Sequence, residues 1–159
     1  MAPSGADGET TEVAAGPVLF AYDGSELAEF AIEQAAGQLA PGRDAVVVCV
    51  WQPADVGFLP VGGREFDAAQ AGEVRKAAEE TAAYGASLAE RAGFRSQSLA
   101  RQAAPTWKGI VRAAEDRGAS LIVLGSHRRA GLAGHLLGSV ASAVVAHAAV
   151  SVLVVRRPA

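Results

Sequence analysis

The chain has 159 residues, of which half are hydrophobic and 19% are charged, and its formal net charge is −3. A chain of this length buries roughly 70% of the surface that it exposes when unfolded, so we expect one compact domain with a core and not a disordered protein. The slight acidic excess predicts no nucleic-acid partner. No stretch approaches the ~18 consecutive apolar residues of a membrane span, so no membrane partner is expected either.

The N-terminal segment differs in composition from the rest of the chain. Residues 1–15 are rich in Gly, Ala, Glu and Thr and have neither the basic start nor the apolar core of a signal peptide. We expect a flexible tail over 1–15, followed by a single domain over 16–157. The one cysteine, Cys49, lies in an apolar run, which predicts a buried, inert thiol. Together these features favour a cytoplasmic protein.

The first part of the domain predicts two buried strands separated by a helix. Residues 18–22 and 45–51 are continuous apolar runs, which are typical of parallel strands buried on both faces. Between them Ser25 has the character of a helix N-cap, and apolar residues recur at helical spacing after it. Trp51, at the end of the second run, is expected to pack in the core and not to serve as a stacking platform.

A long connection follows the second strand. Residues 52–70 contain prolines and glycines without a strong hydrophobic period, and they exceed the usual length of a connection. Two hypotheses stay open for this segment: a functional flap over the edge of the sheet, or a partly disordered link.

The second part of the domain continues the alternation of helices and strands. Helices are predicted by the helix formers of residues 74–92, by Pro105 and Thr106 as a helix start, and by the apolar stripe of residues 136–148. The remaining strands are predicted at 95–100, where the pattern is weak, at 121–124 and at 150–155. We therefore expect an α/β fold: a single open, doubly wound, Rossmann-like sheet of five parallel strands in the order 3-2-1-4-5, with helices on both faces.

In a sheet of this kind ligands bind beyond the carboxyl ends of the strands, where the strand order reverses. The segment 125–140, rich in Gly, Arg and His, falls there, between a buried strand and a helix. The N–H groups and positive dipole at a helix N-terminus suit a phosphate, and glycine lets the backbone approach it closely. The motifs GxxxxGK[ST] and GxGxxG are absent, so the sequence predicts neither a P-loop nor a dinucleotide fingerprint.

Three segments together resemble the universal stress protein family. They are Tyr22-Asp23-Gly24-Ser25, the loop that begins LIVLGSH and ends LLGSVA, and the final strand VLVV. The resemblance covers residues 17–156. The nucleotide-binding branch of that family has the motif G-x2-G-x9-G-[ST], so the resemblance implies a site for an adenine nucleotide such as ATP, with Mg²⁺ arriving together with the phosphates.

The resemblance also implies which residues form this site. The Asp23 carboxylate would face the ribose or the base, Val50 would offer backbone groups to the adenine, and Val140 would add an N–H near the phosphates. The positions implied are Ala21, Tyr22, Asp23, Val50, Leu124, Gly125, Arg128, Gly138, Ser139 and Val140. From the residues alone, Asp23-Gly24-Ser25 could equally form only a turn and a helix cap.

Arg128 departs from the motif, because it stands where the second glycine belongs. Two hypotheses stay open. Its side chain could collide with the ligand or force a different backbone path, or it could make a charge-assisted contact with a phosphate.

The sequence contains no catalytic constellation. GxSxG is absent, Asp23 is the only candidate base beside the loop, and no metal ligands recur at a diagnostic spacing. We therefore expect a stress-response protein that binds an adenine nucleotide as a sensor or regulator, and not an enzyme. Two alternatives are a nucleotide-free dimeric interaction module and a weak ATPase.

The final strand bears on assembly. In the strand order 3-2-1-4-5 the apolar residues 149–155 lie at one edge of the sheet, where they would present unpaired backbone groups. Antiparallel pairing with a second copy would cover this edge, and the family resemblance implies the same homodimer through the C-terminal strand.

Overall fold

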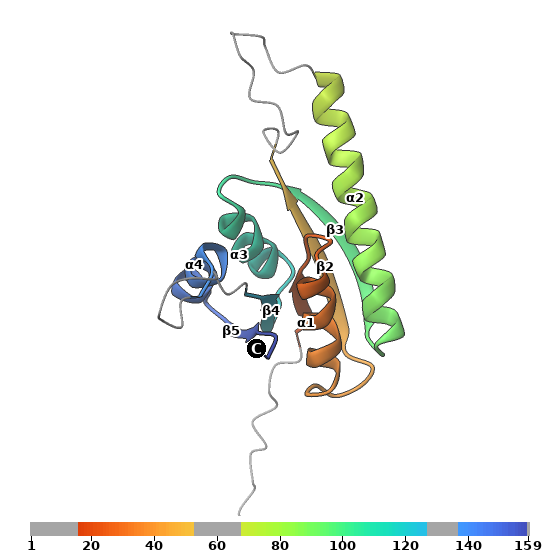
Figure 1. Cartoon of the computed structure of the whole chain (residues 1–159), viewed down its shortest axis with the longest axis vertical. Helices are drawn as coiled ribbons and strands as arrows, with labels where there is room; N and C mark the ends of the chain where they lie inside the picture. Colours follow the sequence, from red (N-terminus) through yellow and green to blue (C-terminus); the bar gives the residue numbers. More distant parts are fainter. Residues whose placement is uncertain (1–15, 53–67, 127–136, 159) are drawn as a thin grey trace, which may run out of the picture.

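The computed structural model describes residues 16–52, 68–126 and 137–158. Over these residues, five strands alternate with four helices along the chain (Figure 1). The elements are β1 (Val18–Ala21), α1 (Glu26–Ala36), β2 (Asp44–Trp51), α2 (Ala68–Arg91), β3 (Arg95–Gln102), α3 (Thr106–Asp116), β4 (Leu121–Gly125), α4 (Ser139–His147) and β5 (Ser151–Val155).

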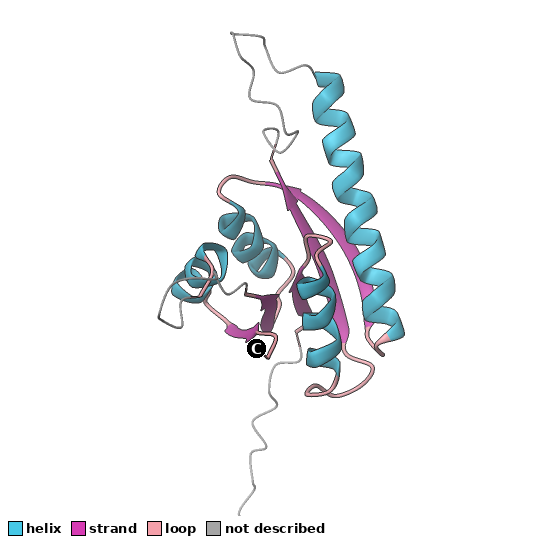
Figure 2. Ribbon diagram, in the orientation of Figure 1, coloured by secondary structure: helices cyan, strands magenta, loops and turns pink. Residues whose placement is uncertain are grey.

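The strands form one parallel sheet in the order β3-β2-β1-β4-β5, which confirms the predicted fold. In Figure 2 the strands, in magenta, lie between helices on either side. β1 is the central strand, since it pairs with β2 on one side and with β4 on the other. The chain first adds strands on the β2 side and then crosses to the β4 side. The strand order therefore reverses between β1 and β4, and this is the point at which doubly wound sheets bind ligands.

Helices α1 and α2 cover one face of the sheet (Figure 1). The core of this face contains Phe20, whose ring contacts that of Phe94 edge-on with centroids 5.2 Å apart. At Gly85 helix α2 approaches the sheet so closely that a Cβ would lie 2.6 Å from Cδ1 of Tyr22. A smaller cluster beside this core contains Cys49 and Trp51, so the predictions that both side chains are buried are confirmed.

Helices α3 and α4 cover the other face (Figure 1). Leu19, Ile122 and Val144 are fully buried there. At Gly109 helix α3 lies close to β2, because a Cβ at this position would be 2.7 Å from Cγ1 of Val50.

The structure moves some of the predicted boundaries. Helix α2 begins at Ala68, six residues before the predicted start, because the segment before Val74 contains helix formers but no apolar period to reveal them. β3 extends to Gln102, two residues beyond the predicted end at residue 100, because its polar residues form only a weak strand pattern. The predicted tail over 1–15 and residues 53–67 of the long connection lie outside the described residues.

Candidate functional site

A cavity of about 330 Å³ lies at the carboxyl ends of β1, β2 and β4, where the strand order reverses. Nine of the ten site residues expected from the sequence line it. They are Ala21, Tyr22, Asp23, Val50, Leu124, Gly125, Gly138, Ser139 and Val140. The tenth, Arg128, lies outside the described residues. The fold thus brings together positions that are up to 119 residues apart in the sequence, from Ala21 to Val140.

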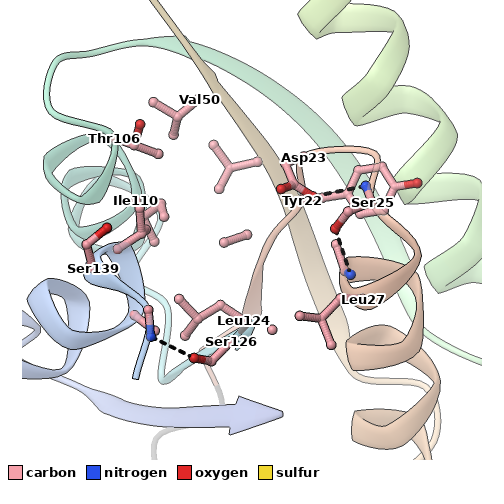
Figure 3. A pocket seen from close by; sticks show the side chains of 17 residues that line it. Tyr22, Asp23, Ser25, Leu27, Val50, Thr106, Ile110, Leu124, Ser126 and Ser139 are labelled. Atoms are coloured by element: carbon pink, nitrogen blue, oxygen red, sulfur yellow. Dashed lines mark hydrogen bonds between the residues drawn. The ribbon is translucent and has the colours of Figure 1, made fainter. Parts of the chain in front are cut away.

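The wall of the cavity is apolar on the sheet side and polar at its rim (Figure 3). Val50, Ile110 and Leu124 contribute hydrocarbon from β2, α3 and β4. Asp23 contributes a carboxylate and Ser139 a hydroxyl, from opposite sides of the cavity in Figure 3. A flat apolar group with a charged substituent would therefore find complementary surroundings here.

The turn after β1 serves both local structure and the cavity. Oδ1 of Asp23 accepts a hydrogen bond from the backbone N–H of Ser25 at 3.0 Å, and Oγ of Ser25 accepts from the N–H of Ala28 at 3.2 Å. Ser25 is thereby the N-cap of α1, as predicted. Gly24 has φ of +82°, a conformation that glycine adopts without strain. Asp23 also lines the cavity, so its role in the turn does not remove its carboxylate from the cavity.

Helix α4 begins at the cavity. Its N-cap is Gly138, which has no side chain to cap the helix, and the first intrahelical bond runs from the N–H of Ser142 to the Gly138 carbonyl. The residues of the first turn, Ser139, Val140 and Ala141, all line the cavity. The N–H groups and the positive end of the helix dipole therefore lie beside the cavity, which favours a negatively charged ligand.

Ser126 connects the two ends of the segment between β4 and α4 through a hydrogen bond. Its side chain is buried, with 5% of the residue's surface exposed. Its backbone N–H donates to the carbonyl of Val155 at 3.0 Å, and its Oγ accepts from the N–H of Gly138 at 2.9 Å (Figure 3). The residues on either side of 127–136 are thus held together by one hydroxyl.

Gly125, the first glycine of the predicted nucleotide motif, also has a packing role. A Cβ at this position would lie 2.7 Å from Cγ of Leu27 and 3.2 Å from its carbonyl oxygen. Glycine therefore lets the start of α1 approach the end of β4, whether or not a ligand is bound.

Tyr22 and Asp23 are the only ionisable residues among those that line the cavity in the described ranges. Burial and the nearby carboxylate of Glu29 raise the pKa of Tyr22 well above its usual range, and its hydroxyl donates to Glu29 Oε1 at 3.3 Å. The phenol is therefore neutral at ordinary pH. Within the described part of the chain, no group of three or more His, Cys, Asp or Glu side chains could hold a metal ion.

Sequence reasoning missed eight residues that line the cavity. They are Ser25, Leu27, Ala28, Val48, Thr106, Ile110, Ser126 and Ala141. Two of them could have been predicted from their neighbours in the sequence. Val48 lies on the same face of its strand as Val50, because side chains alternate along a strand. Ala141 follows Val140 in the first turn of the predicted helix. For Thr106 and Ile110 the sequence carried no such signal, since only the tertiary fold places α3 beside the end of β2.

Among the described residues, no helix combines the length and the apolar character that a membrane crossing requires.

The His147 ring, at the end of α4, lies with Nδ1 2.8 Å from the Ala143 carbonyl and stacks on Trp107 of α3. This pair joins the two helices that frame one side of the cavity.

Comparisons with known proteins give consistent matches. The sequence model of the Universal stress protein family matches residues 15–156. A universal stress protein of Mycobacterium tuberculosis is 34% identical over 142 residues, which are 89% of this chain and 45% of the relative. One of Mycolicibacterium smegmatis is 36% identical over 146 residues and is again covered to 45%. The chain therefore spans about half the length of these curated relatives.

Solved structures share the fold. That of hypothetical protein MJ0577 superposes with a TM-score of 0.71 at 26% identity, covering 91% of this chain and 98% of the other. A universal stress protein from Archaeoglobus fulgidus, solved in complex with dAMP, superposes with a TM-score of 0.56 at 26% identity and covers 87% of this chain and 96% of its own.

Proposed function

This chain belongs to the universal stress protein family, and from that premise we propose that it binds an adenine nucleotide as a sensor or regulator, without dedicated catalysis. The observation that carries the proposal is the convergence of nine expected positions on one cavity at the switch point of the sheet. The Archaeoglobus relative that was solved with dAMP supports the choice of an adenine nucleotide. ATP is the ligand that we expect, with Mg²⁺ held mainly by the phosphates and water.

The chemistry of the cavity supports an orientation for this ligand. The base would lie against Val50 and Ile110, where the wall is apolar, and the phosphates would lie at the N-terminus of α4. Asp23 would then face the ribose, since its carboxylate lies at the rim and the turn uses only one of its oxygens. The volume of about 330 Å³ is at the small end of the range for ligand pockets, about 300–1,000 Å³, and suits a nucleoside whose phosphates lie at the edge of the cavity beside the first turn of α4.

The test is calorimetric titration of ATP, with and without Mg²⁺, into protein stripped of nucleotide. Ser139→Asp places a negative charge in the first turn of α4, where it favours the helix but repels phosphate. We expect this variant to lose about tenfold or more in affinity for ATP, while the uncharged Ser139→Asn retains most of it. Equal affinities of the two variants for ATP would show that the phosphates do not lie at α4 and would contradict the proposed orientation.

Asp23→Asn tests the other side of the cavity. The amide oxygen can still accept the N–H of Ser25, so the turn is preserved while the negative charge is removed. We expect weaker binding of both ATP and adenosine, because both contain the ribose. Unchanged binding of both would leave Asp23 with its role in the turn alone.

Absence of binding by the wild-type chain at millimolar ATP would favour the alternative, a nucleotide-free interaction module. Arg128→Gly then decides whether the departure from the family motif is the cause, because tighter binding in this variant would identify Arg128 as an obstruction. The other alternative, a weak ATPase, requires ATP turnover above a blank that Asp23→Ala abolishes. We expect no such turnover.

We also propose that the protein is a homodimer through β5. Among the described strands β5 pairs with β4 alone, and its three central residues, Val152 to Val154, are apolar and only partly buried. Antiparallel pairing with a second copy would complete the backbone hydrogen bonds of this edge. In analytical ultracentrifugation, Val154→Lys should sediment as a monomer, whereas Ser98→Lys on the opposite edge strand β3 should sediment like the wild type.

The cytoplasm is the compartment in which we expect the protein to act. A cysteine buried beside Trp51 needs no oxidising environment, and the family comparison is compatible with this location. Fractionation of cells that express the protein tests this, and recovery outside the cytoplasmic fraction would contradict it.

A further inference from the structure

Ser126 connects three parts of the molecule that lie far apart in the sequence. It follows the last residue of β4, its backbone N–H binds the Val155 carbonyl at the end of β5, and its Oγ binds the N–H of Gly138, twelve residues on. The side chain is buried and lines the cavity. Only one of the two hydrogen bonds depends on the hydroxyl, because the bond to Val155 comes from the main chain.

The partner of this hydroxyl matters because Gly138 is the N-cap of α4. A glycine cap has no side chain with which to hold the first turn, and the structure gives α4 no side-chain cap hydrogen bond. Helix α1, on the other side of the cavity, is held by the hydroxyl of its own Ser25. The N-terminus of α4 is instead held by a residue outside the helix, since Oγ of Ser126 accepts a hydrogen bond from the N–H of Gly138 (Figure 3).

We propose that Ser126 is a positioning residue, which fixes the N-terminus of α4 so that its first-turn N–H groups meet the phosphates of a bound nucleotide. The proposal rests on the proposed function and names a residue at a position that the nucleotide motif leaves unspecified. Ser126 acts through Gly138, while Ser139, Val140 and Ala141 line the cavity that the phosphates would approach. Loss of the hydroxyl should therefore weaken the binding of phosphates and not that of the nucleoside.

The first experiment compares ATP with adenosine. Calorimetric titrations are made on the wild type, Ser126→Ala, Ser126→Thr and a control, Ser87→Ala, which removes an exposed hydroxyl on α2. We expect Ser126→Ala to bind ATP about tenfold more weakly and adenosine less than about twofold more weakly, since the partly buried N–H of Gly138 loses its acceptor. Ser126→Thr, which retains the hydroxyl, should restore the ratio of the two affinities, and Ser87→Ala should leave both unchanged.

An equal loss for ATP and adenosine in Ser126→Ala would show a merely structural role and would overturn the proposal. An unchanged affinity for ATP would overturn it as well. In both cases the wild type still binds ATP, so the proposed function survives. If the wild type binds no nucleotide, the proposed function fails and the phosphate role of Ser126 fails with it.

The second experiment needs no ligand. Amide hydrogen exchange, followed by NMR, reports the two bonds of Ser126 separately. In Ser126→Ala we expect faster exchange at the N–H of Gly138 and unchanged exchange at the N–H of residue 126, whose bond to Val155 remains. Unchanged exchange at Gly138 would show that the hydroxyl does not hold α4 and would overturn the proposal independently of any nucleotide.

Discussion

The two faces of the sheet are packed differently at the same end of the molecule. On the face covered by α1 and α2, packing continues to the end of β1, where the Tyr22 ring fills the space beneath Gly85 of α2. Nearer to α3 and α4, the carboxyl ends of the strands leave a cavity that is bordered by β2, β4, the first turn of α4 and, on its far side, the start of α1. The face of α1 and α2 is thus filled where α2 passes the strand end, whereas room for a ligand remains between the start of α1 and the starts of α3 and α4.

The difference follows from where the helices begin and how closely they approach. Helix α2 passes the end of β1 in mid-helix, and Gly85 removes the Cβ that would hold it away. Helices α3 and α4 begin near the ends of the strands, so that their N-termini border the cavity. Helix α1 also begins at the cavity, since its N-cap Ser25 and its first-turn residues Leu27 and Ala28 line it. The cavity therefore lies where helices start and not where α2 passes.

The largest effect is expected from one substitution made at two positions of α2. Gly85→Ala places a Cβ 2.6 Å from Cδ1 of Tyr22 and 2.8 Å from Cγ1 of Val47, so we expect a loss of about 2–3 kcal/mol in the free energy of unfolding. Gly72→Ala meets no atom within 4 Å and should gain about 0.5–1 kcal/mol from helix propensity. Urea denaturation measures both, and equal effects would contradict the close packing of this face.

The second prediction adds volume to each face with the same change. Ile32→Phe enlarges a side chain that is 1% exposed on the filled face, and we expect it to cost about 1–3 kcal/mol. Ile110→Phe lies against the cavity, so the ring can extend into it at a smaller cost while nucleotide affinity falls. Denaturation and titration of both variants test this. A greater loss of stability at position 110 would mean that the cavity is not open to the side chain.

The third prediction compares the helix starts on the two sides of the cavity. Ser25→Ala removes the oxygen that accepts the Ala28 N–H, so we expect a loss of about 1 kcal/mol in the free energy of unfolding. Ser139→Ala should change stability by less than about 0.5 kcal/mol, because α4 has no side-chain cap to lose. Thermal denaturation of the two variants measures both effects. A larger loss of stability in Ser139→Ala than in Ser25→Ala would contradict the prediction.

The smallest effect at neutral pH is expected for Tyr22→Phe, which removes one long hydrogen bond to Glu29. At alkaline pH the two proteins should differ more. Burial and Glu29 raise the pKa of Tyr22 above its ordinary value of 10.0. The unfolded chain therefore releases the phenol proton first, and the stability present below pH 10 declines as the pH rises above it. Denaturation curves between pH 8 and about 11 should show a shallower decline for Tyr22→Phe than for the wild type, and parallel declines would contradict the raised pKa.

Much of the fold could be predicted from the sequence, because buried parallel strands are continuous apolar runs of β-branched residues. The runs at 18–22, 45–51 and 121–124 coincide with β1, β2 and β4 to within a residue or so. The hydrophobic pattern of β3 is weak because an edge strand needs fewer apolar residues. The start of α2 was not predicted because an exposed helical turn has no apolar period.

The candidate site divides in the same way. Glycines and an aspartate at strand ends are visible as sequence motifs, and nine positions predicted through the family resemblance line one cavity. Ser126 was not predicted, since its partner Gly138 lies twelve residues away and the contact exists only once β4 and α4 are packed. The second role of Gly125, against Leu27, likewise needs the packed helix α1.

The sequence by itself therefore predicted the order of strands and helices, because this depends on local composition and spacing. The family and the positions of the candidate site were predicted through the resemblance of its motifs to a known family. The tertiary structure alone decided which face of the sheet is filled, which helix begins at the cavity without a cap of its own, and which hydroxyl holds that helix in place. These features depend on distances between elements that are remote in the chain, and close packing fixes such distances only when all the elements are present.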